Sequence, residues 1–202
     1  MKQNQIVAAN PQGKGLIPVL DDLRSVTPVL AQGKSAHQLL ADFFTSTLVL
    51  GAKFNFKPSL GVNYYLYLDN QQWKLSLVEP QAWRNRLPGI YFGECMLNTD
   101  QTWSVKPCES WQQNPNLCNE LEKLQSAFIA SLNNDNSIID NLPFYQSNLA
   151  YYQRLGANAL ARSIKQSLQL GLGKKQLGSD ISKQLLSEAF NANQPLITNR
   201  SC

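Results

Sequence analysis

The chain has 202 residues, enough for one domain with a buried core or for about one and a half domains. Hydrophobic residues make up 43% of it, which excludes global disorder, and charged residues only 16%, below the ~25% typical of globular proteins. The formal net charge of +4 is too small for a protein that binds nucleic acid over its whole surface.

The first 34 residues are expected to form an irregular arm, because prolines and glycines interrupt them too often for a long helix. Lys2 is not followed by the roughly 7–15 apolar residues of a secretory signal. No stretch approaches the ~18 apolar residues of a membrane span. These features predict a soluble, cytoplasmic protein without a transmembrane segment.

A helix is expected to begin at Ser35, because Ser35 and Gln38 have the spacing of a capping box. Apolar residues then recur on one helical face, up to a predicted end near residues 51–53. The residues on this face are Ala36, Leu39, Leu40, Phe43 and Phe44.

Between Gly61 and Val105 the apolar pattern changes to a period of two, which predicts four short strands. We expect these strands at residues 64–68, 73–77, 91–97 and 102–105, with a hairpin loop at 69–72 and a turn at 98–101. Neighbouring strands joined in this way predict a small antiparallel β-meander. Its apolar face needs a cover, for which the helix from Ser35 is the natural candidate.

Beyond Lys106 the sequence predicts helices. Asn114 and Pro115 have the character of an N-cap and a first-turn proline, and an apolar stripe follows as far as Leu132. A longer helix is expected from near Pro143 to the glycines at 171 and 173, and a short last helix at residues 179–190. The predicted fold is therefore α+β, with an arm (1–34), a helix plus meander (35–106) and a helical region (107–202) packed on the same body.

The strand region carries the pattern F-x-P-x-x-G-x-x-Y-x-L-Y, followed by L-x-x-D-x-T-W-x-V. The residues concerned are Phe56, Pro58, Gly61, Tyr64, Leu66, Tyr67, Leu97, Asp100, Thr102, Trp103 and Val105. With these motifs the chain resembles the family known as domain of unknown function 2452, which has bacterial and animal members. Residues 10–18, 142–145 and 151–155 also resemble bacterial members.

The resemblance implies no activity, ligand or catalytic residue, so its motif residues are expected to support the fold. This expectation covers Phe56, Pro58, Gly61, Tyr64, Leu66, Asp100 and Trp103. Asp100 is expected to form an Asx turn, in which its carboxylate accepts a backbone amide.

No set of residues in the sequence specifies a reaction, so a catalytic role is the less favoured prediction. His37 is the only histidine, and at the start of a predicted helix it is expected to be a surface or capping residue. The four cysteines lack zinc spacing and are expected to remain reduced thiols. Residues 171–175 lack phosphate-loop spacing and indicate a helix stop. We expect neither a cofactor nor a metal.

The function is not specified, and three hypotheses remain open. The favoured one is a non-catalytic protein-interaction module, which engages an unknown protein partner or itself through exposed strand edges or its helical half. The second is a nucleic-acid-binding protein, in which aromatic side chains stack on bases and cations meet phosphate. Its candidate residues are Tyr65, Tyr67, Trp73, Trp83, Arg84 and Arg86. The third is an enzyme with an unrecognised site.

A basic stretch lies between Asp140 and Asp180, where the sequence has no acidic residue. Such a stretch could face an anionic membrane. Because its other polar positions are mostly Asn, Gln and Ser, packing against the preceding helix is expected instead, and membrane-surface contact is not favoured.

Overall fold

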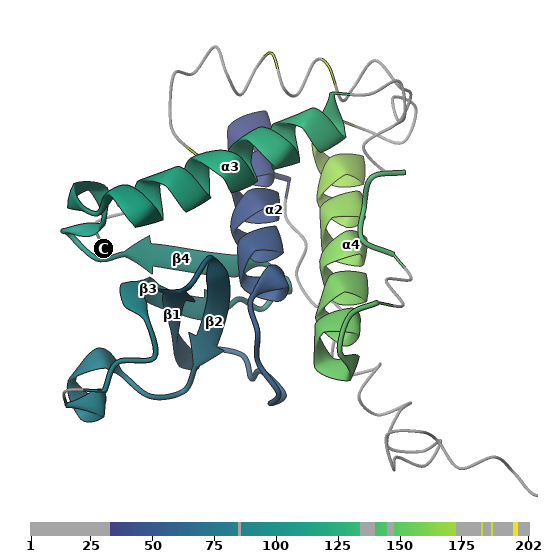
Figure 1. Cartoon of the computed structure of the whole chain (residues 1–202). Coiled ribbons are helices and arrows are strands. Elements are labelled where there is room, and N and C mark those ends of the chain that lie inside the picture. The colour runs from purple at the N-terminus through teal and green to yellow at the C-terminus, as the bar shows by residue number, and fades with distance from the viewer. Residues whose placement is uncertain are drawn as a thin grey trace, which may run out of the picture.

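The computed structural model describes residues 33–84, 86–133, 140–144 and 148–172, together with Lys183, Ser187, Leu196 and Ile197. Its main elements are α2 (Ala36–Gly51), β1 (Asn63–Asp69), β2 (Gln72–Ser76), β3 (Ile90–Leu97), β4 (Trp103–Pro107), α3 (Pro115–Leu132) and α4 (Tyr151–Leu172). Figure 1 shows α2 between the sheet and α4, with α3 crossing one end. The predicted α+β class is confirmed. Nearly all of the predicted arm and of the predicted helix at 179–190 lies outside the described residues.

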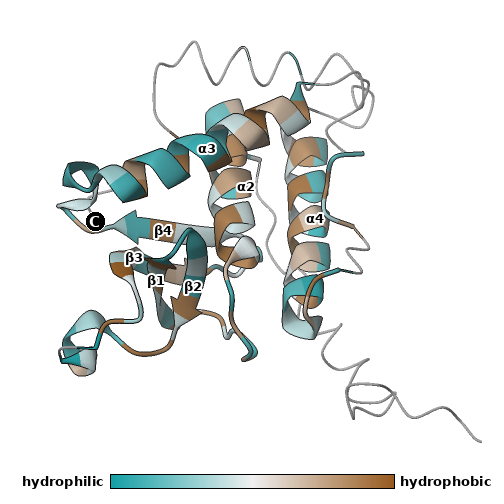
Figure 2. Cartoon of the chain, in the orientation of Figure 1, coloured by the Kyte–Doolittle hydropathy of each residue, from teal (hydrophilic) through white to brown (hydrophobic). Residues whose placement is uncertain are grey.

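Helix α2 begins as the sequence predicts. The Ser35 hydroxyl accepts the Gln38 N–H at 3.3 Å, and the Gln38 side chain accepts the Ser35 N–H at 3.2 Å. This capping box satisfies two amides that the helix itself leaves unpaired. Figure 2 shows α2 as mainly hydrophobic along its length, as expected of a helix between two layers.

The four strands form one antiparallel sheet, as predicted, but in the order β2-β1-β3-β4 rather than the sequential order of a meander. The segment between β2 and β3 is long and includes a 3-10 turn at Pro80–Trp83, so it carries the chain across to the other edge of β1. Periodicity identified the strands but contained no information on which neighbour each one chooses.

The first hairpin is tighter than predicted. Asp69 and Gln72 pair with each other, which leaves only Asn70 and Gln71 in the turn. Both turn residues have positive φ, 45° and 66°. Such two-residue turns match the right-handed twist of the flanking strands, which explains why the loop is shorter than the four residues expected.

Side chains and backbone from α2 and the segment after it cover part of both sheet edges. On the β2 edge, the Lys53 N–H donates to Trp73 O at 2.8 Å, and the Leu75 N–H donates to Lys53 O at 3.1 Å. On the β4 edge, the Trp103 N–H donates to the Ser46 hydroxyl at 2.8 Å, and the Thr45 hydroxyl donates to Trp103 O at 2.7 Å. These positions are not open to a partner strand, which corrects the expectation that the strand edges are exposed.

The apolar stripes of the later helices reach the same core as α2 and the sheet. On α3, which has the predicted bounds, the Phe128 ring lies 5.1 Å from that of Phe43 and 5.3 Å from that of Phe44. Helix α4 begins at Tyr151 rather than near Pro143. The Gln153 side chain accepts the Ala150 N–H at 3.2 Å and so closes the helix start at that point.

Replacing Gly93 with alanine is expected to destabilise the protein by about 1–3 kcal/mol, because overpacking forces the backbone to move. A Cβ at Gly93 would overlap Lys106 O and lie 2.7 Å from the Pro107 Cα. Gly51→Ala is the matched control, since nothing lies within 4 Å of a Cβ there. Urea unfolding should show a loss for Gly93→Ala and no loss for Gly51→Ala. Equal midpoints for the two variants would contradict the prediction.

Candidate functional site

A pocket of about 280 Å³ opens where the end of α2, the loop 57–60, the β3–β4 turn and the first turns of α4 meet. Apolar side chains form most of its wall: Leu50, Pro58, Leu60, Leu97, Trp103 and Leu155. Lys57, Ser59, Gln101, Tyr152 and Gly156 complete it. An apolar concavity with a few polar groups is the usual form of a binding site.

The loop that forms one wall of the pocket is held at two points. The Ser59 N–H donates to the Tyr64 hydroxyl at 2.7 Å, and the Gly61 N–H donates to Leu97 O at 3.1 Å. Gly61 has φ +68°, a conformation that glycine adopts without steric cost. The wall is therefore preformed and does not depend on an occupant for its shape.

Aromatic rings support the same wall from inside the core. The Phe56 ring stacks on Tyr64 with centroids 5.5 Å apart and planes at 8°, and Trp103 meets Tyr64 edge-on at 5.5 Å. Trp103 borders the pocket although only 2% of it is exposed. The motif residues expected to support the fold thus also build the sheet-side wall of the pocket.

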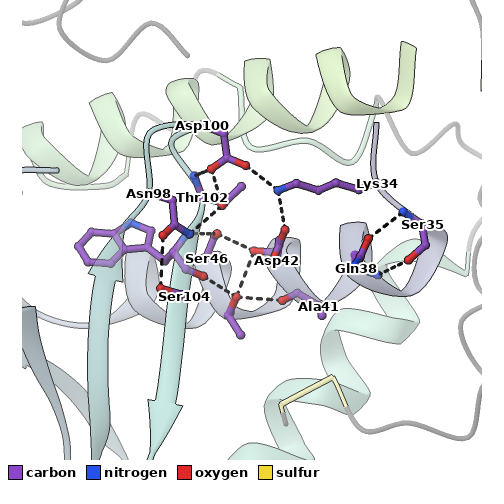
Figure 3. Close-up of polar contacts among 12 residues, drawn as sticks. Lys34, Ser35, Gln38, Ala41, Asp42, Ser46, Asn98, Asp100, Thr102 and Ser104 are labelled. Carbon is purple, nitrogen blue, oxygen red and sulfur yellow. Dashed lines mark hydrogen bonds and ion pairs between the residues drawn. The ribbon is translucent and has the colours of Figure 1, made fainter. Parts of the chain in front are cut away.

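The turn before β4 is fixed to α2 by an ionic cluster (Figure 3). Lys34 Nζ lies 2.6 Å from Asp42 Oδ2 and 2.6 Å from Asp100 Oδ2, and all three side chains are mostly buried. Asp100 Oδ1 also accepts the Thr102 N–H at 3.1 Å and the Thr102 hydroxyl at 2.6 Å. The predicted Asx turn is confirmed.

The pKa of Asp100 lies below its ordinary value. Burial acts to raise it, but the hydrogen bonds from Lys34 and Thr102 and the charge of Lys34 together outweigh that effect. For Lys34, burial acts to lower the pKa, and its hydrogen bonds to Asp100 and Asp42 outweigh this and raise it. Both groups are therefore held in their charged forms.

Gln101 is the unusual residue of the pocket. Its φ is +67°, in the left-handed region, where glutamine is uncommon. Only 4% of the residue is exposed, and it lines the pocket. No hydrogen bond joins its side-chain amide to another residue in the described part of the chain. Nothing in the sequence marked Gln101, because it reads as an ordinary polar turn residue.

Helix α4 is joined to the end of α2 by a second buried glutamine, which the sequence analysis also missed. Gln153 Nε2 donates to Leu50 O at 3.1 Å and to Ala52 O at 2.6 Å. These carbonyls lie at the end of α2, where helices leave acceptors unpaired. Because Leu50 lines the pocket together with Leu155, Gln153 fixes the spacing of two of its walls.

Comparison with protein families gives one match. The model described as protein of unknown function (DUF2452) matches residues 26–127, just over half of the chain. The chain belongs to this family. No curated protein and no solved structure matches it. The match covers the ionic cluster, the sheet and the sheet-side wall, whereas the α4 side of the pocket lies beyond it.

The six residues suggested for nucleic acid do not form one surface in this family member. Trp73 is buried on the inner sheet face, 5.4 Å from the Phe92 ring. Tyr67 is on the outer face but 0% exposed, and its hydroxyl and the Trp83 Nε1–H both donate to Val78 O. Of the remaining three, Tyr65 is half-buried, and Arg84 and Arg86 are exposed.

The histidine and the cysteines considered as catalytic or metal-binding residues do not line the described part of the pocket. His37 is in the first turn of α2, at the opposite end of that helix from Leu50. Cys95, Cys108 and Cys118 are free thiols, and burial raises the pKa of Cys95. Within the described residues there is no cluster of three metal-ligating side chains, and no helix there is long and apolar enough to cross a membrane.

Replacing Asp100 with asparagine is expected to lower the free energy of unfolding by about 1–3 kcal/mol at neutral pH, because it removes a charged acceptor from Lys34. A lowered carboxyl pKa stabilises the fold above the ordinary value of 3.8, and this contribution is lost as pH falls through the folded-state pKa. The difference between wild type and Asp100→Asn should therefore shrink at acid pH. Denaturant unfolding of both proteins, at pH values from about 2 to about 7, measures this difference.

Asp69→Asn is the matched control, because its ion pair with Lys74 is more than one-third exposed on both sides. Such surface pairs contribute about 0–1 kcal/mol. A loss for Asp69→Asn as large as that for Asp100→Asn would contradict the role given to the cluster.

Replacing Gln101 with glycine is expected to leave the free energy of unfolding unchanged or to raise it by up to about 1 kcal/mol. Glycine removes the cost of a left-handed glutamine, against the loss of some apolar contact. Thermal and urea unfolding of the two proteins measure this. A loss of more than about 1 kcal/mol would show that Gln101 serves the fold.

Proposed function

We propose that this family member is a non-catalytic protein-interaction module that holds an apolar side chain of a partner protein in the pocket beside Trp103. The observation that carries the proposal is the preformed apolar wall, in which the loop 57–60 is fixed by the Tyr64 hydroxyl and by Leu97 O. Preformed pockets that accept one large side chain are typical of the energetic centres of protein interfaces.

Exposed apolar side chains at the same end of the sheet favour a protein as the occupant. Leu60 is 45% exposed, Val62 39% and Met96 37%. Leu60 pairs with Leu97, and Met96 lies opposite Asn63 at the start of β1. Apolar surface next to a pocket favours a macromolecular partner over a small ligand, which would be served by the pocket alone.

The pocket offers little to a catalytic mechanism. Among the described residues, its wall contains no aspartate, glutamate, histidine or cysteine. The nearest carboxylate in sequence, Asp100, is engaged by Lys34 and Thr102. General acid–base chemistry requires a titratable group within hydrogen-bond reach of the bound molecule. In the part of the wall that the structure describes, Lys57 and Tyr152 are the only such groups.

The outer sheet face supports nucleic acid less well than the pocket supports a protein. Tyr65 lies opposite Glu94 on the neighbouring strand, where a carboxylate repels phosphate. Lys74 on the same face is paired with Asp69 at 2.6 Å. Stacking surfaces for single strands combine exposed rings with an uninterrupted basic groove. On the described part of this face Tyr65 is half-buried, and acidic residues interrupt the basic ones.

Filling the pocket is expected to abolish partner capture without unfolding the protein. Ser59→Trp places an indole at an exposed position on the pocket wall, and its backbone bond to Tyr64 is retained. Pull-downs from nuclease-treated lysate of the source organism, quantified by mass spectrometry, should show at least one stoichiometric protein reduced more than tenfold. Thermal unfolding should confirm that the variant is folded.

Ser126→Trp is the matched control, because Ser126 is exposed on α3, away from the pocket-lining residues. The same protein should be captured by wild type and by Ser126→Trp. Partners that are retained equally by all three forms, or capture seen only in a parallel lysate without nuclease treatment, would contradict the proposed function.

A further inference from the structure

Gln101 contributes the only side-chain amide among the described residues of the pocket wall. The residue is 4% exposed, lines the pocket and has no side-chain hydrogen bond within the described part of the chain. The buried side-chain atoms without a partner in the described part of the chain are Trp73 Nε1, Ser163 Oγ and Ser167 Oγ. The Gln101 amide is not among them, so it is accessible from the pocket and available to an occupant.

The backbone conformation of Gln101 is also unfavourable. Its φ of +67° falls where a turn of this kind usually places glycine, and the Gln101 N–H closes the turn by donating to Asn98 O at 2.9 Å. Strained residues persist where the surrounding structure fixes them, and they concentrate at functional sites. The turn could be built more easily without a glutamine, so the turn itself does not explain this side chain.

The hydrogen-bonding groups of the amide restrict the chemical class of the ligand that the pocket would accept. A glutamine side chain presents an acceptor oxygen and a donor NH₂ side by side, and a peptide group offers the complementary pair. A carboxylate could use only the donor. It would also lie near the cluster of Lys34, Asp42 and Asp100, whose formal charges sum to −1.

We infer that Gln101 pairs with a backbone peptide group of the partner, next to the apolar side chain that enters the pocket. The inference rests on the proposed function and adds the chemical class of its ligand: an extended, uncharged peptide segment with one large apolar residue. Apolar contact with Leu60, Trp103 and Leu155 supplies the attraction, and Gln101 fixes the direction in which the segment runs.

The test is a pair of small probes titrated into isotope-labelled full-length protein and followed by NMR. The first is N-acetyl-leucine N′-methylamide, which has a leucine side chain between two peptide groups. The second has the same skeleton with both peptide nitrogens methylated, so that it has no N–H donor. We expect the first to shift the methyl signals of Leu60 and Leu155 saturably and to bind at least fivefold more tightly than the second.

Gln101→Met keeps the length of the side chain and removes both hydrogen-bonding groups. In this variant the preference for the first probe should fall to within about twofold, because the methylated probe keeps its carbonyl acceptors and differs in lacking the N–H that the glutamine oxygen accepts. Gln112→Met is the matched control, because Gln112 is an exposed glutamine outside the pocket wall, and it should keep the wild-type preference.

The outcomes separate the two proposals. If wild type binds both probes equally, or if Gln101→Met keeps the preference, the pocket stands and the role of Gln101 is wrong. If neither probe shifts a pocket signal, the proposed function fails with it. Adenosine is the third probe, since an adenine edge also offers a donor beside an acceptor. Tighter, Gln101-dependent binding of adenosine would overturn the peptide assignment.

Discussion

The backbone of Trp103 is bound to helix α2 at both of its polar groups, and the rest of the structure depends on this contact. Its N–H reaches the Ser46 hydroxyl and its carbonyl accepts from Thr45, so the edge strand β4 is closed by a helix. The same contact places the indole where it meets Tyr64 and borders the pocket. Strand edge, core and binding site are thus set by two hydroxyl groups on one helical turn.

The two sides of the pocket are built in different ways. The sheet side lies within the segment that defines the family and is held by turns and stacked rings, so it forms when the sheet forms. The α4 side lies beyond that segment and is positioned by Gln153 against the last carbonyls of α2.

Local patterns predicted the helices and strands well, because capping boxes, apolar stripes and period-two alternation are recorded in neighbouring residues. The capping box at Ser35 and the Asx turn at Asp100 are of this kind. The strand order, the late start of α4 and the pocket depend on contacts between distant residues, such as Gln153 with Leu50. The polar pair Thr45 and Ser46 inside an apolar helix was a visible signal of a buried polar contact, although its partner was not.

The composition of the chain explains how such a site can exist with a single charged residue, Lys57, among the described residues of its wall. With few ionisable groups, the protein satisfies buried backbone atoms with hydroxyls and amides, as at Ser46 and Gln153. Gln101 and Gln153 are 4% and 9% exposed, but the Gln153 side chain makes three hydrogen bonds, whereas the Gln101 side chain makes none within the described residues. Because Gln101 lines the pocket and its amide is neither paired nor sealed in the core, a ligand in the pocket can reach it.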